Sequence, residues 1–346
     1  ISSADTGFAD LGYTFSQPAV VKAKGDGWVS IFGNGFDSAS GKAVLYIVDL
    51  DDGDLENSIV LDNGSGNGLA TVAPVDTDND GEVDLIYAGD LKGNLWRIEA
   101  NNSGFGSGGV SLLYTAKENA TDTGYQSITT RPEVGYHPTK IDGRMVFFGT
   151  GKYYQSDDGD PSTSASNTFY GIYDDDSGGG TIDNPKIESV TDHTSSTVLQ
   201  RQTVEVQTVD TFFGESDEFS YTIRVVSDET VDWATQSGWY LDLPDTAEKL
   251  VANPILRGGR IIFVTTIPSL SPCLSGGDSW LMEICADNGG RCDQAVFDLN
   301  GDGVFDFNDS YATTDDGGTT TYTSISGKKS KVGLSLIHIS EPTRLC

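Results

Sequence analysis

The sequence is poor in the residues that build redox and nucleophilic centres. Among 346 residues it has three His and two Met, and none of its four Cys stands in a C-x-x-C pair. It contains no G-x-S-x-G elbow, and neither His137 nor His193 has a natural Ser or Asp partner nearby in sequence. These absences argue against zinc, thioredoxin-like and Ser–His–Asp chemistry. We therefore expect a protein that is not an enzyme.

Positive charge is also scarce. Lys and Arg number 21 against 52 Asp and Glu, which gives a formal net charge of −31. A polyanion of this size repels nucleic acid and anionic membrane surfaces, so we expect neither as a partner. The sequence has no run of 18 apolar residues, so no membrane insertion is expected. Because the chain opens at Ile1 rather than Met, we expect a fragment, and the missing signal peptide carries no information on secretion.

The residues that are abundant predict an all-β fold. The 42 Gly cluster with Asp, Asn and Ser between short apolar runs that are rich in β-branched and aromatic residues. No helical period of useful length is found. The apolar runs that we predict as strands are 28–33, 43–50, 83–89, 94–100, 145–151, 168–174, 221–226, 238–243, 260–266 and 279–284.

These runs recur as pairs roughly every 50–60 residues, which favours the blades of a β-propeller, with a sandwich or jelly roll as the alternative. Three polar stretches are predicted as long surface loops, at 100–125, 155–166 and 176–200. We expect the propeller to occupy residues 1–332. Residues 333–346 lack the Gly/Asp rhythm and are predicted to be a non-native read-through tail.

Three cysteines offer a disulfide whose pairing the spacing leaves open. Cys285 and Cys292 flank a turn-like ADNGGR stretch and could face each other across a hairpin. Cys273 is the other candidate partner for either of them. A disulfide is typical of an extracellular protein.

The most specific motif is the acidic loop that runs from Asp76 to Asp84. It places carboxylates at positions 1, 3, 5 and 9, a backbone carbonyl at position 7, and Gly81 at position 6 for a sharp turn. This oxygen-rich spacing suits calcium, whereas magnesium demands a tighter octahedron. Position 12 is Tyr87 instead of Glu, so the loop is no EF-hand and Asp84 must close it. The predicted calcium ligands are Asp76, Asp78, Asp80, Glu82 and Asp84, and the alternative is an Asp-rich turn without metal.

A second loop near the end of the chain has similar spacing, with Gly303 again at position 6. Its candidate calcium ligands are Asp298, Asn300, Asp302, Val304, Asp306 and Asp309. The alternative is a solvated turn between two strands. The acidic turns at 49–54, 157–160 and 174–176 lack this spacing and are predicted to be solvated. Trp28, Trp96, Trp239 and Trp280 fall in or beside strands and are predicted to pack within blades.

With these strands and loops side by side, the chain resembles the C-terminal β-propeller of the PilC/PilY family of type IV pilus tip-associated adhesins. The resemblance extends to about Val332 and rests on several segments. They are 10–22, 31–38, APVDTDNDGEVDLIYAGDLKGNLWRI (73–98), 128–138, 146–154, 168–174, 238–244 and 256–284.

The resemblance implies a modified seven-bladed propeller whose first blades and closing strand are absent here. It implies that Asp76, Asp78, Asp80 and Asp84 bind calcium through side chains and Glu82 through its main-chain oxygen. In that family calcium is linked to pilus extension and retraction, and the protein assists attachment to surfaces. The expected partners are minor pilins and a host or abiotic surface. The expected location is the pilus tip or cell surface of a Gram-negative bacterium, after export through the periplasm.

Two other classes share some of these features. A structural cell-surface module held together by calcium would use the same residues without a role in pili. A quinoprotein-like dehydrogenase also combines a propeller with calcium, but its metal meets the quinone in a central pocket, whereas this loop is contained within nine residues.

Overall fold

The fold was analysed in a computed structural model that describes residues 1–118, 124–140, 143–155, 158, 160, 166–176, 198–214, 218–269 and 277–330. These residues form β-strands and one short 3-10 helix, Phe307–Asp309. The all-β prediction is therefore confirmed. The chain divides into two compact units, residues 1–152 with 173–198 and residues 153–172 with 199–346. None of the described helices has the length and apolar character needed to cross a membrane.

The first unit contains two four-stranded antiparallel sheets, each a simple meander. One consists of β1 (Ala19–Ala23), β2 (Gly27–Gly33), β3 (Ala43–Asp49) and β4 (Leu55–Asp62). The other consists of β5 (Leu69–Val75), β6 (Leu85–Asp90), β7 (Asn94–Asn101) and β8 (Gly104–Thr115). A four-stranded meander is the blade of a β-propeller. The unit also holds the antiparallel pair β9 (Glu133–Tyr136) and β10 (Arg144–Gly149).

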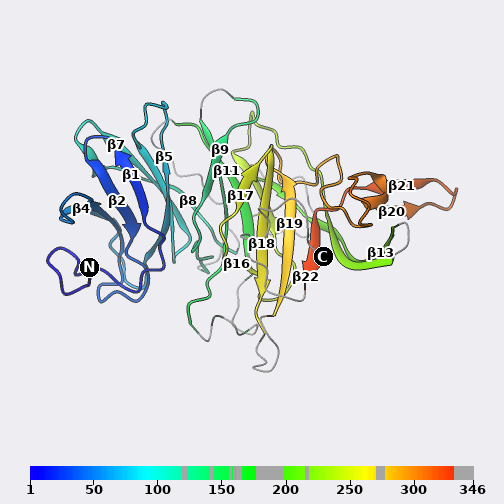
Figure 1. Cartoon of the computed structure of the whole chain (residues 1–346), viewed down its shortest axis with the longest axis horizontal. Coiled ribbons are helices and arrows are strands. Elements are labelled where there is room, and N and C mark those ends of the chain that lie inside the picture. The colour runs from blue at the N-terminus through cyan, green and yellow to red at the C-terminus, as the bar shows by residue number, and fades with distance from the viewer. Residues whose placement is uncertain are drawn as a thin grey trace. The chain divides into compact units, whose positions relative to one another are not determined.

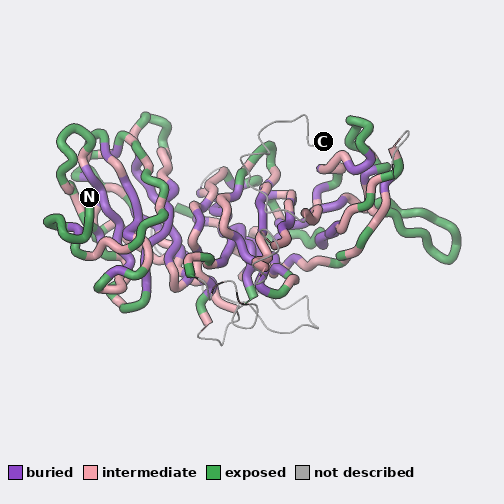
Figure 2. Tube along the Cα trace, turned by 60° about the horizontal axis from the view of Figure 1, so that its bottom comes forward, coloured by how far each residue is buried: buried purple, intermediate pink, exposed green. Residues whose placement is uncertain are grey.

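The core of this unit is made by β-branched and aliphatic side chains of the two meanders. Val29, Ile31 and Ile47 of the first sheet share one buried cluster with Ile86 and Ile98 of the second. Burial follows the strands, and the turns between them are exposed (Figure 2). The strands β3 and β6 are buried along nearly their whole length, which explains why their sequences are continuous apolar runs without polar alternation.

The second unit is built around a seven-stranded sheet in which β18 and β19 lie side by side (Figure 1). Its main path runs β13-β14-β22-β19-β18-β16, and β17 also pairs with β18. A second group pairs β11 with β15, and β15 with β12, and β20 and β21 form a separate hairpin. The strand bounds are β11 (Thr168–Asp174), β12 (Gln200–Gln202), β13 (Val204–Phe213), β14 (Glu218–Val226), β15 (Gly238–Asp242), β16 (Lys249–Leu250), β17 (Ile255–Arg257), β18 (Arg260–Ile267), β19 (Asp278–Cys285), β20 (Tyr311–Thr314), β21 (Thr320–Thr323) and β22 (Gly327–Ser330).

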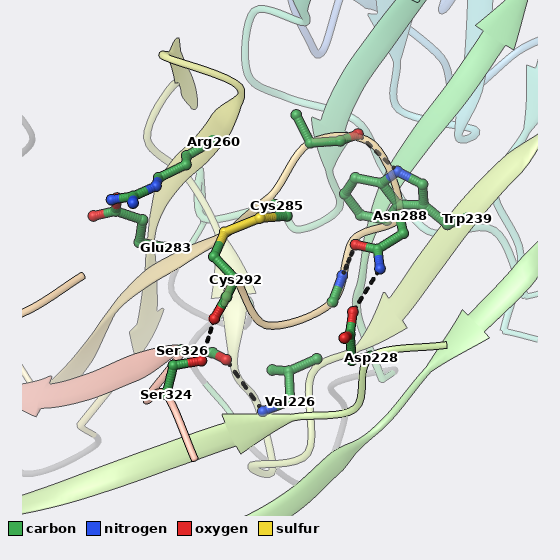
Figure 3. Close-up of a disulfide and its surroundings, with 12 residues drawn as sticks. Val226, Asp228, Trp239, Arg260, Glu283, Cys285, Asn288, Cys292, Ser324 and Ser326 are labelled. Atoms are coloured by element: carbon green, nitrogen blue, oxygen red, sulfur yellow. Dashed lines mark hydrogen bonds and ion pairs between the residues drawn. A yellow bond between two sulfur atoms is a disulfide. The ribbon is translucent and has the colours of Figure 1, made fainter. Parts of the chain in front are cut away.

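The cysteine pairing left open by the sequence is between Cys285 and Cys292, whose Cα atoms are 5.2 Å apart. The bridge closes the turn after β19, and Trp239 lies against the same turn (Figure 3). The indole N–H of Trp239 donates to the carbonyl of Ala286 at 3.1 Å. A Cβ atom at Gly289, where φ is +75°, would lie 2.2 Å from the Trp239 ring, so this turn requires Gly. Cys273 lies outside the described residues.

All ten apolar runs predicted as strands coincide with strands of the structure. The predicted surface loop at 100–125 is wrong, because β8 occupies Gly104–Thr115 and is paired along β7. Phe105 is buried near the start of this strand, and Leu113 and Tyr114 are buried near its end. Buried side chains at both ends thus hold the Gly- and Ser-rich stretch in the sheet. The prediction that Trp28 packs within a blade is also wrong, since 59% of this residue is exposed, whereas Trp239 and Trp280 are fully buried. The loops predicted at 155–166 and 176–200 lie mostly outside the described residues, and the tail 333–346 entirely so.

Candidate metal centre

The loop Asp76–Asp84 joins β5 to β6 in the first unit. Two of its residues take the left-handed conformation that reverses the chain, Asn79 with φ +62° and Gly81 with φ +89°. Gly adopts this region at little cost, which explains its place at position 6, and Asn is the side chain that tolerates the region best. The backbone therefore forms the tight turn that the motif predicts.

Three of the five predicted ligands come together. One carboxylate oxygen from each of Asp76, Asp78 and Asp84 lies within 4.8 Å of the other two. Asp84 is buried, Asp76 is half-buried and Asp78 is exposed. Asp76 Oδ2 accepts the N–H of Gly81 at 2.8 Å, but Asp76 Oδ1 is buried and has no hydrogen-bond partner. A buried carboxylate oxygen without a partner is costly, and a cation at this point would satisfy it. The donor set therefore fits a hard divalent cation.

The other two predicted ligands are placed differently. Asp80 Oδ1 accepts the backbone N–H of Glu82 at 2.8 Å, and Asp80 is exposed at the rim of the loop. The Glu82 carboxylate forms an ion pair with Lys22 of β1 at 2.8 Å, and its hydrogen bond raises the pKa of Lys22. Since the Glu82 side chain is engaged outside the cluster, only its backbone oxygen is free to face a cation in the loop.

The end of the loop is anchored to the sheets on both sides. Asp84 Oδ2 accepts the Thr77 hydroxyl at 2.8 Å, and Asp84 Oδ1 accepts the Thr77 N–H at 3.2 Å. The Asp84 carbonyl accepts the N–H of Ala100 in β7 at 2.8 Å. Val83 exchanges backbone hydrogen bonds with the segment 22–24 at the end of β1. Disorder in this loop would therefore break hydrogen bonds to β1 and β7 and loosen the start of β6.

A polar network that is buried around Asp174 and exposed at Asp176 lies beside the loop. Arg144 donates to the Thr77 carbonyl at 3.4 Å and pairs with Asp176 at 2.5 Å. Asp174 accepts from Arg97 Nε at 2.9 Å and from the Tyr87 hydroxyl at 2.5 Å. Burial, together with the charge of Asp174, raises the pKa of Tyr87.

The prediction of a solvated acidic turn at 174–176 is therefore wrong for Asp174, which is only 3% exposed. Its partners Arg97 and Tyr87 lie 77 and 87 positions away in the sequence. No local spacing could have identified them, because the contact depends on strands that the fold brings together.

The second predicted loop lies between β19 and β20 and makes a similar turn, with Gly301 (φ +73°) and Gly303 (φ +80°) at its left-handed positions, but its side chains are used differently. Asp309 accepts from the N–H groups of Leu299 and Asn300 through Oδ1, at 2.7 and 3.2 Å, and from that of Asp306 through Oδ2 at 3.2 Å. Asp309 thus uses both oxygens to hold the backbone, and it is 1% exposed.

The remaining predicted ligands of this second loop also bond within it. Asp298 accepts from the N–H groups of Gly301 and Gly303, at 2.8 and 3.0 Å. Asn300 Nδ2 donates to Asp302 at 3.0 Å, and Asp302 accepts the N–H of Val304 at 2.7 Å. The loop 298–309, all of which is described, does not form a convergent group of three carboxylates as the first loop does.

The histidine that the structure describes has a structural role. His137 is buried, and its Nδ1 accepts the backbone N–H groups of Thr139 and Lys140 at 3.1 and 2.9 Å. It therefore caps the turn at Pro138. His193 lies outside the described residues.

Comparisons of the chain with a family model, with curated proteins and with solved structures all point to the same family. The family model described as the PilY1 beta-propeller domain matches residues 4–216. The chain is 34% identical over 335 residues to the type IV pilus biogenesis factor PilY1 of Pseudomonas aeruginosa strain PAO1, and this match covers 88% of the chain. It is 32% identical over 308 residues to a PilY1 homolog of Xylella fastidiosa, which covers 81% of the chain.

The match spans 28% of the P. aeruginosa protein and 19% of the Xylella protein, so the relatives are much longer than the matched part. Among solved structures, the crystal structure of the P. aeruginosa PilY1 C-terminal domain superposes with a TM-score of 0.78 and 31% sequence identity. That superposition covers 95% of this chain and 68% of the solved one. The resemblance drawn from the strand and loop motifs is confirmed, and the chain belongs to the PilY1 β-propeller family.

Proposed function

We propose that this chain is the calcium-binding β-propeller of a type IV pilus biogenesis factor, and that it acts by binding rather than by catalysis. The main support for a calcium site is the convergence of the Asp76, Asp78 and Asp84 carboxylates, together with the buried Asp76 Oδ1 that has no hydrogen-bond partner. The pilus role is supported by relatives that are named type IV pilus biogenesis factors.

The physical effect of calcium is to order the loop. Carboxylates crowded into nine residues repel one another until a dication joins them. Because the cation binds the ordered loop, it stabilises that form by RT ln(1 + [L]/Kd). For an extracellular site we expect a Kd between about 10⁻⁶ and 10⁻³ M. Asp80 joins the ligand set through a change of side-chain rotamer, and Glu82 through its backbone oxygen.

In the whole protein, calcium occupancy would regulate pilus extension and retraction and support surface attachment. The partners would be minor pilins and a host or abiotic surface, at the pilus tip of a Gram-negative cell.

A calcium-stabilised surface module without a pilus role is the second candidate, favoured by the anchoring of the loop to β1 and β7. A quinoprotein-like dehydrogenase is the least supported candidate, because the described carboxylate cluster lies in a β5–β6 loop.

We also propose that the loop 298–309 is a second, weaker calcium site, with Asp298, Asn300, Asp302, Val304, Asp306 and Asp309 as ligands. Calcium there would have to displace the hydrogen bonds by which Asp309 holds the backbone. This cost is the reason to expect lower affinity than at Asp76–Asp84.

The test is calorimetric titration of calcium into the purified chain and into two matched variants, Asp84→Asn and Asp306→Asn. Both substitutions keep the side-chain size and remove one negative charge. We expect the tighter site to be lost in Asp84→Asn and kept in Asp306→Asn. Unchanged calcium binding in a folded Asp84→Asn variant would refute the first site.

The pilus role requires the whole protein in a bacterium with type IV pili. Asp84→Asn in the chromosomal gene is expected to change surface piliation and twitching motility while protein abundance stays equal. Normal pili and motility, with calcium binding lost, would favour the structural module instead.

A further inference from the structure

A pocket of about 410 Å³ opens directly beside the acidic loop in the first unit. It is lined by residues 73–76, by residues 131–136 and by Arg144. Its volume falls within the range of small-ligand sites. Two strand segments form its walls, the end of β5 and the whole of β9.

The β9 wall offers main-chain hydrogen-bonding groups. Among the strands that the structure describes, β9 pairs only with β10, so it is the edge strand of its sheet. In an antiparallel strand, every second residue directs its N–H and C=O to the outer edge. The facing end of β5 contains Pro74, which has no N–H to compete for these groups. An extended peptide would find its backbone partners on β9.

The pocket lining contains two guanidinium groups, Arg131 and Arg144, and two carboxylates, Asp76 and Glu133. Arg131 is partly exposed and lies 3.7 Å from Glu133. Arg144 is held in place by Asp176 and by the Thr77 carbonyl. Two guanidinium groups in one small pocket are conspicuous in a chain that has 21 basic and 52 acidic residues. Guanidinium groups recognise carboxylates through paired N–H donors.

The pocket shares one residue with the candidate metal centre. Asp76 lines the pocket and is also the first residue of the acidic loop. Without a cation, its charge opposes the entry of an anion. A cation held by Asp76, Asp78 and Asp84 would neutralise it, and the lining would then hold two guanidinium groups against the single carboxylate of Glu133, a net positive charge.

We propose that this pocket binds an extended peptide segment of a partner protein through a carboxylate, and that calcium in the adjacent loop strengthens this binding. The peptide backbone pairs with the outer edge of β9, its carboxylate meets Arg131 and Arg144, and the exposed ring of Tyr136 covers a neighbouring side chain. Tyr136 is 79% exposed, which leaves it accessible for this contact. The calcium dependence rests on the proposed function, but the pocket itself does not.

By linkage, the coupling is reciprocal. If calcium raises the affinity for the peptide, then the peptide raises the affinity for calcium by the same factor. We expect a factor of about five or more, at the lower end of typical coupling between sites. A partner bound here would therefore be sensitive to the calcium concentration around the pilus.

The test uses the purified chain and a library of fluorescent hexapeptides made in two forms, with a free C-terminal carboxylate and with a C-terminal amide. Selection in excess calcium is expected to enrich peptides that contain a free carboxylate. Enrichment of Asp or Glu in the amide form identifies a side-chain carboxylate as the ligand group, and binding of the free-acid form alone identifies a chain terminus. Fluorescence polarisation then gives affinities with calcium and with a chelator.

Arg131→Gln and Arg144→Gln are each expected to weaken binding of the selected peptide about tenfold, since each removes a charged hydrogen bond. Arg257→Gln, an exposed arginine in the second unit, is the matched control and should leave binding unchanged. Arg131 is the cleaner variant, because Arg144 also bonds to Asp176 and to the Thr77 carbonyl of the acidic loop.

Two results would overturn the pocket assignment. One is a selection without carboxylate enrichment, and the other is equal affinity in the native chain and Arg131→Gln. If calcium still bound the chain, the proposed metal site would survive that failure. Conversely, Arg131-dependent peptide binding that is the same with calcium, with chelator and in Asp84→Asn would refute the coupling and leave the pocket standing.

Discussion

Asp84, the last residue of the acidic loop, bonds back to Thr77, the second residue of the loop. It accepts the Thr77 hydroxyl at 2.8 Å and the Thr77 N–H at 3.2 Å. This contact closes the loop and orients the buried carboxylate of Asp84 toward Asp76 and Asp78. Thr77 is thus a positioning residue for the carboxylates although its own oxygen is not a predicted ligand.

Thr77→Val should lower calcium affinity by about three- to tenfold, because it removes one hydrogen bond to a charged group and keeps the shape of the side chain. The measurement is calorimetric titration of calcium. Thr77→Ser restores the hydroxyl and is expected to bind like the native chain. Equal affinities in the Val and Ser variants would show that the contact does not orient Asp84.

The second unit contains a fully buried ion pair whose rupture should be severe. The side chains of Arg224 and Glu248 are both 0% exposed and form two hydrogen bonds, at 2.7 and 2.8 Å. The guanidinium also lies 3.8 Å from the centre of the Trp280 ring. Removing Glu248 leaves the buried guanidinium with Asp245, 3.3 Å away, as its remaining counter-ion, so Glu248→Leu should lower the free energy of unfolding by about 3 kcal/mol, the lower end for a broken buried pair.

Urea denaturation followed by tryptophan fluorescence measures this change. The double variant Arg224→Met with Glu248→Leu removes both charges and is expected to recover most of the loss, because apolar replacement of a buried pair is often close to neutral. A double variant as unstable as the single one would mean that the pair itself, and not the orphaned charge, carries the stability.

The disulfide between Cys285 and Cys292 should stabilise the second unit moderately. The bridge joins residues that are 7 positions apart, and closing so short a loop removes little entropy from the unfolded chain. The chain-entropy relation gives about 2.5 kcal/mol. Cys285→Ser with Cys292→Ser is expected to lose this amount in urea denaturation, and the native chain in reducing buffer should behave in the same way. No difference between oxidised and reduced chains would contradict the prediction.

Asp245 should make the second unit sensitive to acid. Burial alone would raise its pKa, but hydrogen bonds from Gln207 and Trp280 and the charges of Arg224 and Lys329 outweigh it and hold the pKa below 3.8. The folded state therefore binds this proton more weakly than the unfolded state. The stabilisation is complete above the unfolded value and is lost as the pH falls through the folded pKa.

Asp245→Asn removes this titration. We expect the free energy of unfolding to fall less steeply below pH 3.8 in the variant than in the native chain, and the two curves to run parallel above it. Denaturation midpoints recorded over an acid pH series provide the measurement. Identical acid slopes would show that Asp245 has the same pKa in both states.

The acidic loop and the strands could be predicted because their information is local. A strand is recognised from a short apolar run between turn residues, and the loop Asp76–Asp84 from spacing within nine residues with Gly at the left-handed position. A single turn brings the carboxylates of Asp76, Asp78 and Asp84 together, whereas the similar spacing at 298–309 does not produce such a group. The family resemblance followed from the same local segments.

Other features depended on which distant segments the fold brings together. Asp174 reads as part of a solvated turn until Tyr87 and Arg97 meet it, and the Gly-rich stretch of β8 reads as a loop until β7 pairs with it. The pocket beside the loop combines β5 with β9, which are more than fifty residues apart in the chain. Burial and edge pairing arise from packing between remote strands, and for that reason only the tertiary structure decides them.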